Sequence, residues 1–255
     1  MDRKYLRHFI IPAVLSLVFG IGFQFMVLLL HEQDIISYFL VASVLLIAVL
    51  GATGYTFISQ SRQKVDLIPY LIHPIFLLTG ITGFLAFNEN LFLQIAVILF
   101  AAISYFILFS ENFSDLTHHA HDGVKFFIIL LLYDSVFEGV YYLGITPYAI
   151  LALLFFLTLL LQYHMLWRLR ALHLRYGLAA VGISLFVVFV SWFLMDYYKL
   201  SSYLPLSIMI LSTYYLCWGV LHHVIERNLT ARIFFEYLLV CIMVLIMFFG
   251  LSSGF

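Results

Sequence analysis

Long apolar stretches, each about the length that crosses a lipid bilayer, recur from one end of this chain to the other. A membrane-spanning α-helix needs about 20 mostly apolar residues, because each residue advances about 1.5 Å along the helix axis. Stretches of that kind cover residues 9–30, 35–58, 67–87, 91–110, 124–143, 148–167, 178–196, 205–225 and 233–252. The sequence therefore predicts an all-α, polytopic integral membrane helix bundle. We expect about nine transmembrane helices in a single domain over residues 1–255.

The composition excludes several other classes of protein. Apolar residues make up 65% of the chain and charged residues 10%, whereas soluble domains are about 25% charged. The surplus apolar surface must face lipid, so the bilayer is the first partner that we expect. A net charge of −1 offers no basic surface for nucleic acid. A transmembrane β-barrel does not fit either, because barrel strands alternate in polarity over about 10 residues and these stretches are apolar throughout.

The basic residues predict an orientation. With the N-terminus in the cytoplasm, the cytoplasmic loops and helix ends carry eleven of the 12 Lys and Arg residues. These are Arg3, Lys4, Arg7, Arg62, Lys64, Lys125, Arg168, Arg170, Arg175, Arg227 and Arg232. Only Lys199 falls on the other side. Because cytoplasmic loops are enriched in Lys and Arg, we expect the N-terminus inside, the C-terminus outside, and a location in the cell (plasma or inner) membrane.

Two acidic residues interrupt the apolar stretch 124–143. Asp134 and Glu138 are four residues apart, which puts them on one face of a helix. Counted from residue 124, Asp134 lies about 15 Å along the helix, near the bilayer midplane. An ionisable side chain there costs roughly 2.5–3.5 kcal/mol, and no Lys or Arg is expected at a comparable depth. The pair is predicted to bind a proton or cation, to be neutral and hydrogen-bonded to neighbouring helices, or to pair with a basic group on another subunit.

Histidines gather on the predicted cytoplasmic side, and two groups of them include carboxylates at helical spacing. The groups are His118, His121 and Asp122, and His222, His223 and Glu226. Imidazole nitrogen and carboxylate oxygen are ligands that zinc and iron accept in proteins. The sequence therefore predicts a zinc or iron site at this face as one interpretation. The other is an interfacial role, since histidine has an apolar body and a polar tip.

Small residues recur at helical spacing inside the apolar stretches. Two glycine pairs are examples, Gly51 with Gly54 and Gly80 with Gly83. Small residues let membrane helices approach one another closely. We therefore expect both pairs to lie at contacts between helices.

Three functions fit these features, and whether the chain is an enzyme stays open. The first is a small proton- or cation-coupled transporter that uses Asp134 and Glu138. The second is a non-catalytic membrane subunit or scaffold, which forms homo- or hetero-oligomers through its membrane helices. The third is a metal-dependent intramembrane enzyme with a cytoplasmic-face site of His, Asp and Glu residues. We place the transporter first because buried acids without an opposite charge most need an explanation.

Overall fold

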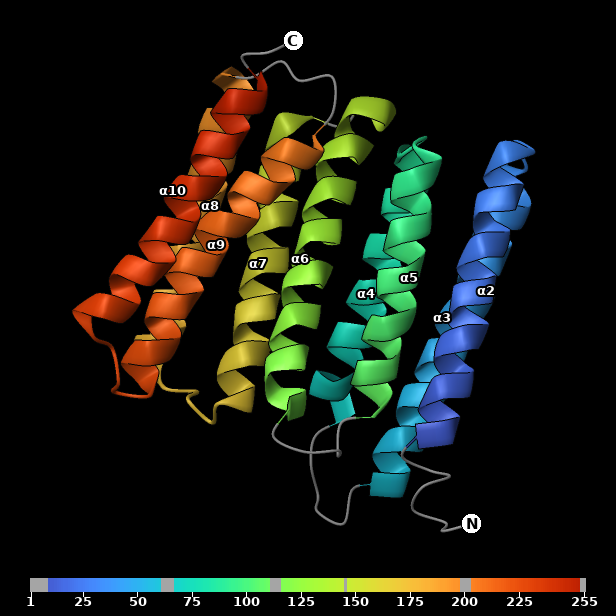
Figure 1. Ribbon diagram of the computed structural model, residues 1–255, viewed down its shortest axis with the longest axis horizontal. Coiled ribbons are helices and arrows are strands. Elements are labelled where there is room, and N and C mark those ends of the chain that lie inside the picture. Colours follow the sequence, from blue (N-terminus) through green and yellow to red (C-terminus); the bar gives the residue numbers. More distant parts are fainter. Residues whose placement is uncertain (1–8, 61–66, 111–115, 145, 198–202, 253–255) are drawn as a thin grey trace. The chain divides into compact units, whose positions relative to one another are not determined.

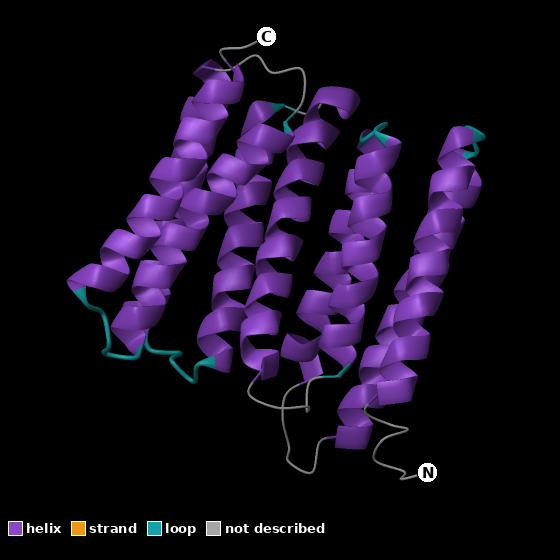
Figure 2. Cartoon of the chain, viewed as in Figure 1, coloured by secondary structure: helices purple, strands orange, loops and turns teal. Residues whose placement is uncertain are grey.

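The computed structural model describes residues 9–60, 67–110, 116–144, 146–197 and 203–252 (Figure 1). The described residues form nine α-helices and no strand (Figure 2), which confirms the predicted all-α helix bundle. The helices are α2 (Ile11–His31), α3 (Ile35–Gln60), α4 (Leu67–Phe87), α5 (Leu91–Phe109), α6 (Leu116–Leu143), α7 (Pro147–Arg168), α8 (Leu174–Tyr197), α9 (Leu204–Ile225) and α10 (Ala231–Ser252). Their order along the chain is that of the predicted apolar stretches.

Six of the helices are long and apolar enough, within the part of the chain that the structure describes, to cross a membrane. They are α2, α3, α5, α7, α8 and α9, with mean hydropathies between 1.6 and 2.6 over the apolar part. Many of their large side chains are exposed on the isolated chain; Leu174 and Ile36, for example, are each 82% exposed. Lipid is the solvent that suits such a surface. The chain is a multi-pass membrane protein.

Helix α6 differs from its predicted stretch because it begins at Leu116 rather than at residue 124. The polar residues 118–122 therefore belong to the helix, which starts before the chain becomes apolar. Lys125, which we expected among the charges at the cytoplasmic surface, lies within this helix and is only 7% exposed. Hydropathy locates the apolar part of a helix, but it does not detect polar turns that extend the same helix.

Polar residues in the connections end one helix and begin the next. The Asp34 carboxylate accepts a hydrogen bond of 3.0 Å from the backbone N–H of Ser37 and so caps the start of α3. The Asn90 side chain caps α5 by accepting from the N–H groups of Phe92 and Leu93, at 3.0 and 3.3 Å. Side-chain and backbone hydrogen bonds from Ser37 hold the pKa of Asp34 below its usual range. They do so because they favour the charged form of the carboxyl group.

The chain divides into two compact units, Met1–Ser135 and Val136–Phe255, and the division falls within α6. The first unit has an aromatic core in which Tyr105 of α5 stacks on Phe19 of α2, with ring centroids 4.5 Å apart. The rings of Phe23 and Phe109 lie 6.2 and 5.7 Å from the same tyrosine. The Tyr105 hydroxyl donates a hydrogen bond of 3.1 Å to the carbonyl oxygen of Pro74 in α4. This core joins α2, α4 and α5.

Glycines let α4 approach α6 in the first unit. A Cβ atom at Gly80 would lie 2.9 Å from Leu131 Cβ and 3.3 Å from the backbone nitrogen of Leu132. The Ser135 hydroxyl donates to the Gly80 carbonyl oxygen at 2.9 Å, a contact that the close approach permits. The expectation for Gly80 and Gly83 is thus confirmed.

The other glycine pair does not pack in this way. A Cβ atom at Gly51 or Gly54 of α3 would meet no atom of the described chain within 4 Å. The expectation of a helix contact at this pair is therefore wrong for the residues that the structure describes. Small size permits a close approach, but it does not create one.

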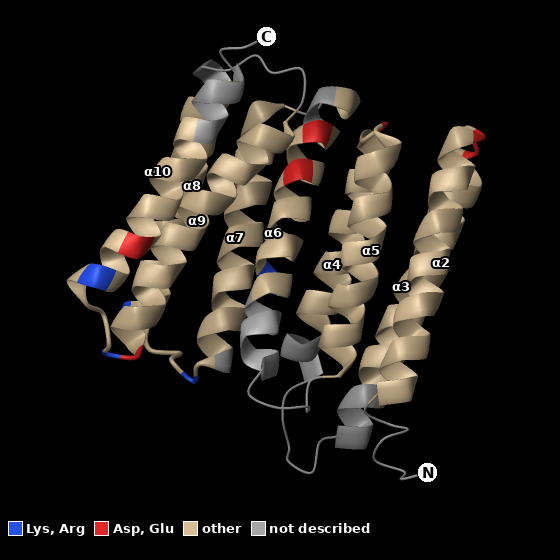
Figure 3. Cartoon of the chain, in the orientation of Figure 1, with Lys and Arg blue, Asp and Glu red and all other residues tan. Residues whose placement is uncertain are grey.

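In the second unit α7 packs against α8, α8 against α9, and α9 against α10. Gly219 of α9 faces the ring of Tyr237 in α10, and any side chain at this glycine would collide with that ring. The Tyr214 hydroxyl of α9 lies 3.2 Å from the sulfur of Met165 in α7. Apart from α6 and Asp196 near the end of α8, the described charged residues of this unit lie in or near the α7–α8 and α9–α10 turns (Figure 3).

Candidate functional site

Asp134 lies in the first unit, where the protein itself encloses its side chain. The residue is 1% exposed. Its neighbour Ser135 fixes the local register of α6 by donating hydrogen bonds to the carbonyl oxygens of Gly80 and Leu131, at 2.9 and 2.6 Å. Lys125 precedes Asp134 by nine residues, about 14 Å along the helix axis, which is too far for a direct ion pair. The low exposure of Asp134 places its carboxyl group away from lipid, in the interior of a membrane helix bundle.

Glu138 lies in the second unit and contacts the start of α9. Its Oε1 atom accepts a hydrogen bond of 3.0 Å from the backbone N–H of Tyr203. Tyr203 is the N-cap residue of α9, and its own side chain makes no capping hydrogen bond. The rings of Phe137 and Tyr203 stack beside this bond, with centroids 6.2 Å apart. Glu138 thus caps α9 from another helix, and its negative charge suits the positive end of the helix dipole.

Glu138→Ala is expected to loosen the beginning of α9. A hydrogen bond to a charged group contributes about 1.5–3 kcal/mol, so the amide hydrogens around Tyr203 should exchange at least roughly tenfold faster. Hydrogen–deuterium exchange with mass spectrometry on the purified protein measures this directly. Glu138→Gln keeps an acceptor oxygen but loses the charge, so it should speed exchange by less than the alanine variant does. Glu236→Ala is the matched control, because it removes an exposed acid of α10 and should leave exchange around Tyr203 unchanged. Equal protection of this segment in the native chain and the alanine variant would contradict the capping role.

The first predicted metal group falls on a part of α6 whose side chains lie outside the described residues. His118, His121 and Asp122 are within the helix, which begins at Leu116. Helical backbone places them at the spacing that the sequence suggested. A zinc or iron site at these residues stays a prediction.

The second predicted group forms a hydrogen-bonded network at the end of α9. His222 Nε2 lies 3.1 Å from Glu226 Oε1, and the indole of Trp218 stacks on the His222 ring at 6.0 Å. His223 contacts different residues. Its Nδ1 atom lies 2.7 Å from Asn228 Oδ1, and its Nε2 atom lies 3.4 Å from the Tyr237 hydroxyl.

Asn228 completes the network. It donates from Nδ2 to Glu226 Oε2 at 3.0 Å, so it bridges the two histidine branches. Among the described residues no group of three or more His, Cys, Asp or Glu side chains is placed to hold a metal ion. The geometry of His222, His223 and Glu226 is that of a turn stabilised by hydrogen bonds.

The second unit contains a buried polar side chain that the sequence patterns did not single out. Gln162 of α7 is fully buried, and neither its Oε1 nor its Nε2 atom has a hydrogen-bond partner within the described chain. Thr158, one helical turn earlier on α7, is also fully buried. An unsatisfied buried amide costs about 1–3 kcal/mol. The sequence signal was present, because glutamine is uncommon in an apolar membrane stretch.

The chemistry available to these groups is the uptake and release of a proton or a small cation. Carboxylates of α6 supply an ionisable group inside each unit, at Asp134 and Glu138. An amide that can donate or accept lies within the second unit at Gln162. Comparisons with known proteins find no match among protein families, curated proteins or solved structures.

Proposed function

We propose that this multi-pass membrane protein is a small proton- or cation-coupled transporter in which Asp134 is the group that binds the proton or cation. The observation that carries the proposal is the 1% exposure of this carboxyl group in the middle of α6. Inserting an ionisable residue into the middle of a membrane costs roughly 2.5–3.5 kcal/mol on membrane-insertion scales, which give the lowest values. Chains that retain such a residue generally use it in an ion or substrate pathway.

Glu138 supports the same function by a different route. While it is ionised, it holds the first turn of α9 through the Tyr203 N–H group. Protonation removes the charge that makes this bond strong, because charge-assisted hydrogen bonds are roughly twice as strong as neutral ones. Loss of this charge would therefore weaken the contact between Glu138 and the beginning of α9. A link of this kind between protonation and helix position is what coupled transport requires.

We further propose that the chain lies in the cell (plasma or inner) membrane with its N-terminus in the cytoplasm. The charges of the described turns support this orientation. The α2–α3 and α4–α5 turns hold Glu32, Asp34 and Glu89 and no basic residue. The α7–α8 and α9–α10 turns hold Arg170 and Arg227. Because cytoplasmic turns are enriched in Lys and Arg, this distribution supports a cytoplasmic location for the α7–α8 and α9–α10 turns.

Flux measurements in vesicles test the transporter. The purified protein is reconstituted into liposomes that contain a pH-sensitive dye, and sodium, amino acids, sugars and nucleosides are offered in turn. At least one of them should drive a proton or sodium flux, and Asp134→Asn should lower its initial rate at least tenfold, because the amide cannot ionise. Glu236→Gln is the matched control, since that acid is 61% exposed and pairs with Arg232 at 2.9 Å. It should keep the native rate.

Two outcomes would overturn the proposal. One is a folded Asp134→Asn variant that transports at the native rate. The other is a native chain that moves neither protons nor sodium with any of the solutes offered. Circular dichroism of each variant before reconstitution separates a lost function from a lost fold.

A further inference from the structure

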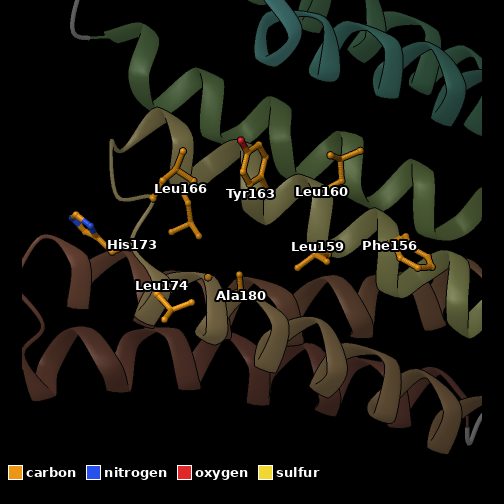
Figure 4. Close-up of a pocket in the computed structure, with 10 residues that line it drawn as sticks. Phe156, Leu159, Leu160, Tyr163, Leu166, His173, Leu174 and Ala180 are labelled. Carbon is orange, nitrogen blue, oxygen red and sulfur yellow. The ribbon is translucent and has the colours of Figure 1, made fainter. Parts of the chain in front are cut away.

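An apolar groove of about 610 Å³ opens between α7 and α8 in the second unit (Figure 4). Its lining includes Phe156, Leu160, Leu166, His173, Leu174 and Ala180. Phe156 is 65% exposed and Leu174 is 82% exposed, so the groove lies on the surface of the unit rather than in its core. In a membrane protein, a surface of this kind faces lipid.

The length of the groove corresponds to one leaflet of a bilayer. Along α7 it runs from Phe156 to Leu166, which is about 15 Å at 1.5 Å per residue. The hydrocarbon core of a bilayer is about 30 Å thick, so one leaflet takes up about half of it. An acyl chain that enters at the membrane surface would fill the groove from end to end.

Basic residues lie in and beside the turn at one end of the groove. His173 lines it there, and residues 168–177 contain Arg168, Arg170 and Arg175 but no acidic residue. Arg170 is exposed and takes a left-handed backbone conformation (φ 52°) at the turn. The Arg175 guanidinium rests on the Tyr176 ring, 4.5 Å from its centroid, and donates to the Tyr176 hydroxyl at 2.8 Å. These contacts hold the Arg175 side chain against Tyr176, next in sequence to the lining residue Gly177.

We propose that the α7–α8 groove binds one anionic phospholipid, with an acyl chain along α7 and the phosphate between Arg170, His173 and Arg175. The charge pattern supports this occupant over a second copy of the chain or a peptide. A phospholipid carries one anionic group at the end of an apolar chain, and the groove offers cations at one end and hydrocarbon along the rest. In the orientation proposed above, this end faces the cytoplasmic leaflet, which is enriched in anionic lipid.

Native mass spectrometry of the purified full-length protein tests the site. The protein is titrated with phosphatidylglycerol and, separately, with phosphatidylcholine of the same acyl chains. The native chain should bind the anionic lipid at least tenfold more tightly. The double variant Arg170→Gln, Arg175→Gln should reduce this preference to twofold or less. Arg227→Gln is the matched control, because Arg227 occupies the equivalent left-handed position (φ 58°) in the α9–α10 turn and should leave the preference unchanged.

A second variant tests the acyl chain. A Cβ atom at Gly177 would meet no described atom within 4 Å, so Gly177→Leu should fold and partly fill the groove. It should weaken phosphatidylglycerol binding at least tenfold, whereas glycerol phosphate should not compete for the native site at millimolar concentration. Equal binding of both lipids by the native chain, an unchanged preference in the double variant, or an unchanged phosphatidylglycerol affinity in Gly177→Leu would overturn the proposal. A dimer that Gly177→Leu abolishes, without any lipid preference, would assign the groove to a second copy instead.

Discussion

Replacing Tyr105 with alanine is expected to lower the free energy of unfolding by about 4 kcal/mol, which is the largest loss that we expect from a single truncation in the first unit. The ring is fully buried and stacks on Phe19, and its hydroxyl bonds the carbonyl oxygen of Pro74. Removing it takes away the ring that stacks on Phe19 of α2 and leaves a cavity between α2, α4 and α5. Aromatic-to-alanine changes in packed cores typically cost 3–5 kcal/mol because neighbouring side chains collapse only in part.

Two companion variants separate the causes of this loss. Tyr105→Phe keeps the ring and removes the hydroxyl, so it should cost only about 1 kcal/mol. Phe92→Ala truncates an aromatic side chain of the same helix that is 78% exposed, and it should leave stability almost unchanged. Unfolding in detergent, followed by circular dichroism against increasing denaturant, gives the three free energies. An alanine variant as stable as the phenylalanine variant would show that the stacked rings contribute nothing.

The helices could be predicted from the sequence because their signals are local. A run of about 20 apolar residues between polar turns predicts a helix without knowledge of the segments that pack against it. The predicted stretch 67–87, for example, has the same bounds as α4. The start of α6 was missed for the same reason. Residues 116–123 are polar enough to lie in water, yet they continue the helix, because backbone hydrogen bonds do not depend on hydropathy.

The candidate site could be predicted only in part. Asp134 and Glu138 are visible in the sequence because carboxylates are rare inside apolar stretches. The partner of Glu138 is not visible, since Tyr203 lies 65 residues later and contributes only its backbone N–H. Likewise, the pair Gly51 and Gly54 resembles Gly80 and Gly83 in sequence. Only tertiary packing shows that the second pair touches another helix and the first does not.

Gly80→Val is expected to lower the free energy of unfolding by about 3 kcal/mol, because the contact between α4 and α6 leaves no room for a side chain. The nearest atoms to a new Cβ belong partly to backbone, at Leu131 and Leu132, and cannot rotate away. The two helices must therefore separate, which also breaks the bond from the Ser135 hydroxyl to the Gly80 carbonyl oxygen. Gly51→Val places the same side chain in open space and is the matched control.

Gly80→Val should also affect Asp134, the proposed transport group. Ser135 adjoins Asp134 in α6, so a separation of α4 from α6 displaces the buried carboxyl group from its surroundings. The Gly80→Val variant should therefore lose flux in liposomes even at temperatures at which it stays folded, whereas Gly51→Val should keep both its stability and its flux. Denaturant unfolding and the vesicle assay, performed on the same preparations, distinguish the two effects. A Gly80→Val variant with native stability and native flux would show that this helix contact positions nothing that transport needs.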